Sequence, residues 1–254
     1  MLTEAALFIV GAILGSFFNV IIHRVPRGES IVRPPSACPA CGTRIRVWDN
    51  VPVVSYVVLR GRCRHCSEPI SPRYPLVELI SAALPVLLYL QFGTTARFWV
   101  YWPLTCALLI VSFIDLDLRI IPDKVTLPGI VLGLVLAPLL GLTGFWSSLL
   151  GVLVGGGALY LIGVVGELVL KKESMGGGDV KLAAALGAFM GWKMVLAALF
   201  LAFFLGAVVG VVVLARRAKN WDSSLPFGPF IALGAVLAVL WGESALLWYA
   251  SLLG

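Results

Sequence analysis

Long apolar runs separated by short polar segments dominate the chain. They lack the alternation of apolar and polar side chains that marks a half-buried strand, so they predict helices. Most have the length of about 20 residues that crosses the hydrocarbon core of a bilayer. Predicted helices cover residues 2–22, 75–92, 98–114, 125–140, 147–170 and 227–253.

One further apolar run, residues 182–215, is interrupted only by Lys193. It is too long for a single span, and we expect a break near Trp192 and Lys193. With the break the chain has about eight transmembrane helices, and without it seven. Eight spans with both termini outside would put the basic segments in the cytoplasm, namely residues 24–73, 119–124, 171–181 and 216–219.

Composition supports a membrane protein. The 254 residues are 60% hydrophobic and 13% charged, with a mean hydropathy of +1.00, whereas soluble domains carry about a quarter charged residues. The first run has Glu4, no basic leader and no obvious cleavage site, so we expect a retained helix rather than a signal peptide. The expected fold is an all-α polytopic membrane protein.

The net charge of +6 raises the alternative of nucleic-acid binding. Nine of the 19 Lys and Arg residues lie in one polar loop, from Arg24 to Arg73. This clustering is typical of a cytoplasmic loop, so we expect the charge to set topology and no nucleic acid to bind.

The same polar loop holds two CxxC pairs, Cys38–Cys41 and Cys63–Cys66. Four thiolates at this spacing predict a closed, structural zinc site in a small zinc-ribbon insert. Disulfides are the alternative, and reducing conditions in the cytoplasm oppose them. His65 is expected to be a solvated neighbour and Cys106 a packing residue.

The predicted domains are a first helix at 1–22, a zinc-binding domain at 23–74 and a membrane-embedded catalytic domain at 75–254.

Two aspartates stand at the ends of apolar helices. Asp115 is expected to end the helix at 98–114, and Asp179 follows a glycine run in Gly176-Gly-Gly-Asp179. Ionisable groups at membrane helices are costly and usually functional. The alternatives are a polar helix end for Asp115 and an N-cap for Asp179. The glycines favour close packing around a site, with Gly176 and Gly178 in a supporting loop.

Two neighbouring carboxylates can perform aspartic proteolysis. One, ionised, takes a proton from water, while the other, protonated, donates to the substrate carbonyl. The sequence does not say which aspartate is the base and which the acid. We predict that Asp115 and Asp179 form the catalytic pair.

At these residues the chain resembles the type IV prepilin peptidase family, also called prepilin leader peptidase/N-methyltransferase, and the presenilin-like GxGD proteases. The resemblance covers nearly the whole chain. It rests on six segments in order: 15–26, the two CxxC pairs, 49–56 with 70–78, 114–123, 175–182 and 226–230.

The resemblance implies an activity. The family removes the basic leader of prepilins on the cytoplasmic side, after a Gly and usually before a Phe, with the pair falling on Asp115 and Asp179. Members with the cysteine domain then N-methylate the new amino terminus with S-adenosylmethionine. This implies the bacterial inner membrane, prepilin or pseudopilin substrates and an active site facing the cytoplasm. It leaves open the S-adenosylmethionine-binding residues, the oligomeric state, and pilus, secretion or competence as the system served.

The same residues also fit other functions. A peptidase without the methyltransferase activity is the nearest alternative. A proton-coupled transporter that uses the two aspartates as relay groups is another, and a zinc-ribbon scaffold without catalysis a third. Asp117, Asp123 and Glu78 are candidates to receive a basic leader, with ordinary helix-end charges as the alternative.

Overall fold

The computed structural model describes residues 1–171, 175–216 and 225–253. It is helical, as the apolar runs predict, and within these ranges only isolated β-bridges stand outside the helices. The elements are α1 (Leu2–Arg24), η1 (Val25–Arg27), η2 (Val47–Asn50), α2 (Val54–Val58), α3 (Arg73–Phe92), α4 (Ala96–Leu118), α5 (Asp123–Leu139), α6 (Phe145–Leu170), α7 (Gly177–Arg216) and α8 (Gly228–Leu253).

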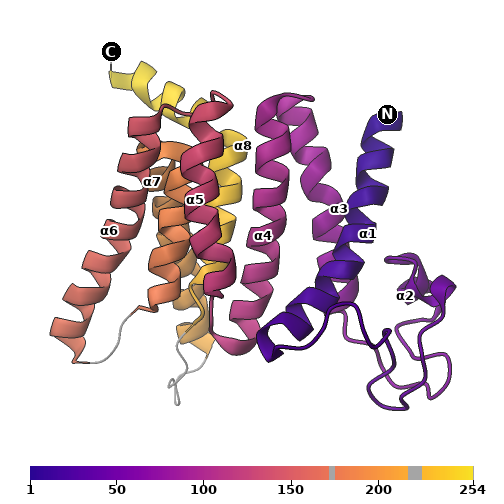
Figure 1. Ribbon diagram of the computed structural model, residues 1–254. Helices are drawn as coiled ribbons and strands as arrows, with labels where there is room; N and C mark the ends of the chain where they lie inside the picture. Colours follow the sequence, from indigo (N-terminus) through magenta and orange to yellow (C-terminus); the bar gives the residue numbers. More distant parts are fainter. Residues whose placement is uncertain (172–174, 217–224, 254) are drawn as a thin grey trace. The chain divides into compact units, whose positions relative to one another are not determined.

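The chain forms two compact units, Met1–Ile110 and Val111–Gly254, and each is described by itself. In the first unit α1 and α3 lie side by side (Figure 1). A Cβ at Gly11 would lie 2.8 Å from Ala82 Cα, and one at Gly15 would lie 2.7 Å from Glu78 Cα. The buried Ser81 hydroxyl donates to the Gly11 carbonyl at 2.8 Å. Small residues therefore bring the two backbones together, as membrane helices require when lipid is as apolar as their side chains.

The second unit uses the same device. Gly151 of α6 and Gly187 of α7 face each other so closely that a Cβ on either would overlap the backbone of the other. A Cβ at Gly133 of α5 would lie 2.6 Å from Ala188 Cβ of α7. The first part of α7 thus packs between α5 and α6 through residues without bulk.

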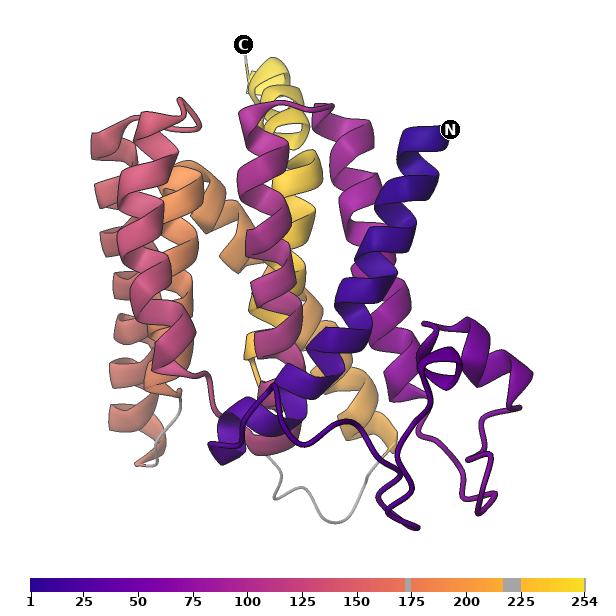
Figure 2. The same cartoon turned by 45° about the vertical axis from the view of Figure 1, so that its right-hand side comes forward.

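The predicted break in the long apolar run is confirmed, one residue earlier than expected, at Gly191. Its φ of 75° and ψ of 170° interrupt α7, and Figure 2 shows the orange ribbon turning there. Glycine accepts this conformation because it has no Cβ. The second segment then packs along α8, where a Cβ at Gly234 would lie 2.9 Å from Ala202 N.

Five helices of the described residues are long and apolar enough to cross a membrane: Leu2–Arg27, Arg73–Phe92, Ala96–Leu118, Phe145–Val169 and Gly177–Ala215. The chain is accordingly a multi-pass membrane protein. The count of eight spans, which needs α5, α8 and both segments of α7, stays a prediction. Of the predicted basic cluster at 216–219, residues 217–219 lie outside the described residues.

One predicted helix end is wrong. The helix expected to stop at residue 114 continues to Leu118, because the Asp115 carbonyl still accepts the Arg119 N–H at 2.9 Å. The helix ends only where Arg119 adopts a φ of 55°. Asp115 therefore lies inside the last turn of α4 and not beyond it.

We expect Gly191→Ala to lower the stability of the protein. A Cβ there would meet Ser147 Oγ at 2.5 Å, and a backbone at this φ and ψ, which is essentially restricted to glycine, costs other residues about 1–3 kcal/mol. Gly210→Ala is the control in the same element, because nothing lies within 4 Å of its added Cβ. Thermal unfolding of the purified protein in detergent measures both. An unchanged midpoint for Gly191→Ala would show that α7 does not need this break.

Candidate active site and metal centre

Asp115 is buried within the second unit, with 5% of its surface exposed. Its Oδ2 accepts the backbone N–H of Gly228, at the start of α8, at 3.0 Å. A Cβ at Gly228 would lie 2.7 Å from the same oxygen. The Gly228 N–H therefore holds the carboxylate in place. Only a glycine can come close enough to donate this hydrogen bond, because a side chain would collide with Asp115 Oδ2.

Asp179 is the third residue of α7, and its N–H donates to the Gly176 carbonyl at 3.1 Å. Its Oδ1 is buried and accepts no hydrogen bond. The alternative reading of Asp179 as an N-cap does not fit, because the residue lies inside the first helical turn. A buried acceptor without a donor is costly, about 1–3 kcal/mol, and such atoms in native proteins usually have a functional reason.

Ile121 links the surroundings of the two aspartates. A Cβ at Gly178 would lie 2.8 Å from Ile121 Cβ, and one at Gly228 would lie 3.2 Å from Ile121 Cδ1. Asp115 contacts Gly228, and Asp179 follows Gly178 directly. The chain thus brings together two acidic groups that lie 64 positions apart in the sequence (179 − 115).

The three glycines before Asp179 differ in how closely they are packed. Gly178 packs directly on Ile121, as close packing of the run predicts. A Cβ at Gly176 would meet only Asp179 Oδ2 of its own turn, at 3.2 Å, and one at Gly177 would meet nothing within 4 Å.

Sequence reasoning gave no role to the segment 226–230, although it singled the segment out. Phe227 contacts Phe203 of α7 with ring centroids 4.9 Å apart, and Phe230 with centroids 6.3 Å apart. These rings fix the start of α8 and with it the N–H of Gly228. The sequence signal was the Gly between two Phe residues, and it could not say which group the glycine would meet.

The other acidic candidates lie in different surroundings. Lys181 Nζ pairs with Asp123 at 2.7 and 2.8 Å. Asp117 is exposed. Glu78 lies in the first unit, where its Oε2 accepts the Val53 N–H at 2.7 Å. The alternative of ordinary structural charges fits Asp123 and Glu78.

The four cysteines of the CxxC pairs form one cluster in the first unit. All four sulfurs lie within 4.8 Å of one another, and Cys38 Sγ is 3.8 Å from Cys66 Sγ. Sulfurs at about 2.3 Å from a tetrahedral zinc ion stand about 3.8 Å apart. The donor set therefore fits a four-coordinate zinc ion. His65 is not part of the cluster, and Cys106 is buried in α4 as expected.

The two pairs lie on hairpins that repeat the same hydrogen bonds 25 positions apart. Gly42 N–H donates to the Cys38 carbonyl at 2.9 Å, and Ser67 N–H donates to the Cys63 carbonyl at 3.0 Å. A β-bridge flanks each hairpin, Ala37 with Arg44 and Arg62 with Pro69. The sequence showed no internal repeat, because apart from the cysteines and Ile45 with Ile70 the matched positions carry different side chains.

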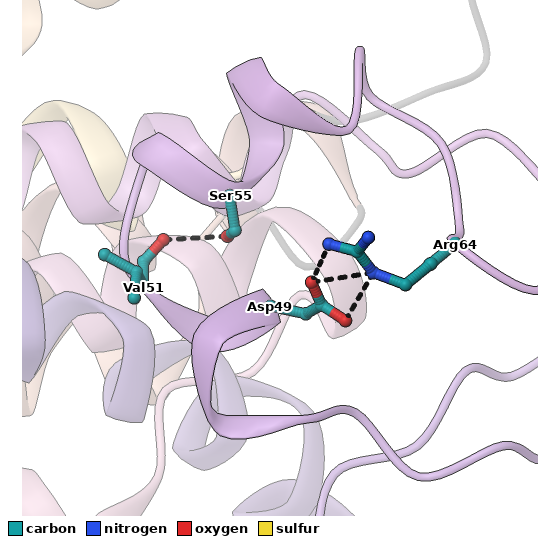
Figure 3. A network of polar contacts seen from close by, with 4 residues as sticks. All are labelled: Asp49, Val51, Ser55 and Arg64. Carbon is teal, nitrogen blue, oxygen red and sulfur yellow. Dashed lines mark hydrogen bonds and ion pairs between the residues drawn. The ribbon is translucent and has the colours of Figure 1, made fainter.

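An ion pair ties the second hairpin to the chain between the pairs. Arg64, inside the second CxxC, donates to both oxygens of Asp49 with contacts of 2.6 to 3.1 Å (Figure 3). The Arg64 guanidinium lowers the pKa of Asp49. A bidentate pair of this kind fixes orientation as well as distance.

The thiols of the cluster differ in pKa. Hydrogen bonds with Thr43 lower the pKa of Cys41 to about 6. Although a backbone hydrogen bond from Glu68 favours its thiolate, the pKa of Cys66 is raised to about 12, because desolvation and the other sulfurs oppose a further negative charge. A bound cation would remove this repulsion, since a metal ion deprotonates its thiol ligands.

Comparison with known proteins agrees with both halves of the chain. Residues 9–92 match the Bacterial Peptidase A24 N-terminal domain, and residues 102–211 match the Type IV leader peptidase family. The chain is 38% identical to a prepilin leader peptidase/N-methyltransferase of Pseudomonas putida, over 92% of this chain and 89% of that protein. It is 36% identical to one of Aeromonas hydrophila, over 95% and 92%, and 43% identical to one of Myxococcus xanthus, over 82% and 62%. No solved structure matches the chain.

The repeat of the hairpins predicts opposite effects at two equivalent positions. Ser67 has a φ of 60° and Gly42 a φ of 69°. Ser67→Gly should therefore slow limited proteolysis of the cysteine hairpins, because it relieves a conformation that costs about 1–2 kcal/mol. Gly42→Ser should speed proteolysis, although no atom lies within 4 Å of its added Cβ. Equal effects at the two positions would contradict the equivalence.

Proposed function

The chain belongs to the prepilin leader peptidase/N-methyltransferase family, and we propose that it removes the leader peptide of prepilins or pseudopilins and methylates the new amino terminus. The proposal rests above all on one observation. Ile121 packs against Gly228, whose N–H bonds to Asp115, and against Gly178, which directly precedes Asp179, in the unit that matches the leader peptidase family. The transporter, scaffold and peptidase-only alternatives are not favoured, since the matched relatives carry both activities in their names.

Asp115 and Asp179 serve as the catalytic pair. One carboxylate, ionised, takes a proton from the attacking water, and the other, protonated, donates to the carbonyl oxygen of the scissile bond. Two neighbouring catalytic carboxylates share a proton, because both do not ionise easily together. The Gly228 N–H orients Asp115, and the free Oδ1 of Asp179 offers an acceptor to water or substrate.

The site is supported by glycine on both sides. Gly178 brings the Asp179 turn against Ile121, and Gly176 leaves room beside Asp179 Oδ2. The protein resides in the bacterial inner membrane with this site facing the cytoplasm, where the basic segments of the sequence would lie. The basic leader and the apolar chain behind it are the partners, together with the bilayer.

The four cysteines hold a structural zinc ion. Cys38, Cys41, Cys63 and Cys66 fill all four positions of a tetrahedral site and leave none for water. The hairpins around them carry little core of their own, so the metal supplies folding free energy. S-adenosylmethionine, when bound, supplies an electrophilic methyl group, and the unit that carries the cysteines is where it would act.

Removal of either carboxylate should abolish cleavage. Asp115→Asn and Asp179→Asn keep the shape of the side chains and lose the acid–base chemistry, so we expect the rate to fall about 10²–10⁴-fold or more. Purified protein in detergent, a prepilin substrate and mass spectrometry of the product measure it.

Asp123→Asn is the matched control, since Asp123 pairs with Lys181, and its rate should stay within about threefold of wild type. Wild-type rates for either Asn variant of the pair would sink the assignment. Failure of the wild-type protein to cut any prepilin would sink the function.

Zinc content follows from the cysteine cluster. We expect one zinc ion per chain in the purified protein, and its loss in Cys38→Ala and Cys63→Ala, with faster proteolysis of residues 23–74. Cys106→Ala should keep the full zinc content, because Cys106 lies in α4 away from the cluster. Elemental analysis by plasma mass spectrometry measures this. Zinc-free wild-type protein, prepared without chelators, would contradict it.

A further inference from the structure

The first unit holds a cavity of about 610 Å³. Its walls come from the end of α1, the start of α3, α2 and both cysteine hairpins. Small-molecule sites generally measure about 300–1,000 Å³. The cavity lies wholly within residues 16–78 and contains neither catalytic aspartate.

A buried carboxylate and a strained turn meet at this cavity. Glu78 is 9% exposed and lines it. Its Oε2 accepts the N–H of Val53, whose φ of 62° and ψ of −48° are foreign to a β-branched residue. Val54 N–H donates to the Pro52 carbonyl at 2.6 Å and closes a γ-turn of the rare, positive-φ kind. Strain that the surroundings hold in place gathers at ligand-binding sites.

Within the part of the chain that the structure describes, the hydrogen-bond partners given for Glu78 carry no charge. A backbone N–H of Val53 and the side chain of Ser16 bond to it, and both are neutral. Asp49, which also lines the cavity, is instead neutralised by Arg64. A buried carboxylate served by neutral donors attracts a cationic ligand.

We propose that this cavity binds S-adenosylmethionine, with the Glu78 carboxylate as the counter-charge of its sulfonium. The inference rests on the proposed function and deepens its second half by naming the site. The rings of Tyr56 and Tyr74 line the cavity and give an adenine base faces to stack on. Arg24 and Arg44 line it too and suit the carboxylate of the methionine part.

A second hollow, of about 370 Å³, shares Ser16, Arg24 and Asn50 with the first. Its wall includes the apolar side chains of Ile13 and Phe17 on α1. This second hollow can hold the amino terminus of the cleaved prepilin, whose first residue is apolar, next to the bound S-adenosylmethionine. There the deprotonated amine nitrogen forms the N–C bond while the electrons of the breaking C–S bond stay on sulfur. The neutral thioether leaves, and one proton passes from the methylated amine to solvent.

Binding in detergent tests the site on the full-length protein. Isothermal titration gives the Kd of S-adenosylmethionine and of S-adenosylhomocysteine, which differ by the methyl group and its positive charge. Glu78→Gln keeps the side-chain shape and an acceptor for Val53. It should weaken S-adenosylmethionine at least 10-fold and S-adenosylhomocysteine less than threefold, because only the first carries a sulfonium.

A second pair of variants tests the space. Ser55 of α2 lines the cavity and donates to the Val51 carbonyl at 2.7 Å (Figure 3). Ser55→Trp should fill the cavity and abolish binding of both ligands. Val57→Trp is the matched control on the same helix, since Val57 is 67% exposed and lies outside the cavity lining, and it should bind both ligands as wild type does.

The outcomes separate the two proposals. Equal weakening of both ligands by Glu78→Gln, or wild-type binding by Ser55→Trp, would overturn the cavity assignment. So would a wild-type protein that cuts and methylates prepilin while the cavity variants bind both ligands unchanged. Prepilin cleavage by each variant, measured in parallel, reports folding, and a wild type that cuts no prepilin would refute the proposed function instead.

Discussion

The structure depends on one constraint, the close approach of helix backbones at glycine residues. In lipid, apolar side chains gain little by meeting one another, so helices must gain contact and satisfy polar groups at short range. Gly11 and Gly15 do this between α1 and α3, and Gly151 with Gly187 between α6 and α7. The same device builds the site, since Gly178 and Gly228 admit Ile121 and Asp115 to distances that a side chain would forbid.

The polar part of the first unit solves a different problem. Its chain is too short and too charged to fold around an apolar core, and its order comes from paired hydrogen bonds, the Asp49–Arg64 ion pair and four converging sulfurs. These features fix the walls of a cavity against α1 and α3. The buried Glu78 then belongs to both parts, since it stands on a membrane helix and holds the turn at Val53.

Three carboxylates, those of Asp115, Asp179 and Glu78, stand on apolar helices next to backbone N–H groups or glycines. Asp115 accepts the N–H of Gly228, Glu78 accepts the N–H of Val53, and Asp179 directly follows Gly178. A neutral donor does not cancel the charge of a carboxylate, which can then act in chemistry or attract a cationic ligand. In a buried ion pair the neighbouring lysine or arginine would neutralise that charge.

The amino-acid sequence by itself determined the helical class and the four cysteines that cluster, and it singled out two aspartates as candidates, because apolar runs, thiol spacing and acids beside apolar runs are local patterns. It also determined the break in α7 to within one residue of Gly191. It was wrong about the end of α4, where one more turn forms, and it missed the repeat of the hairpins, which lies in hydrogen bonds rather than in side chains. Only the tertiary structure decided that Gly228 meets Asp115 and that Glu78 meets Val53. Such contacts join positions far apart in the chain, and their partners are set by how helices pack, which no local pattern records.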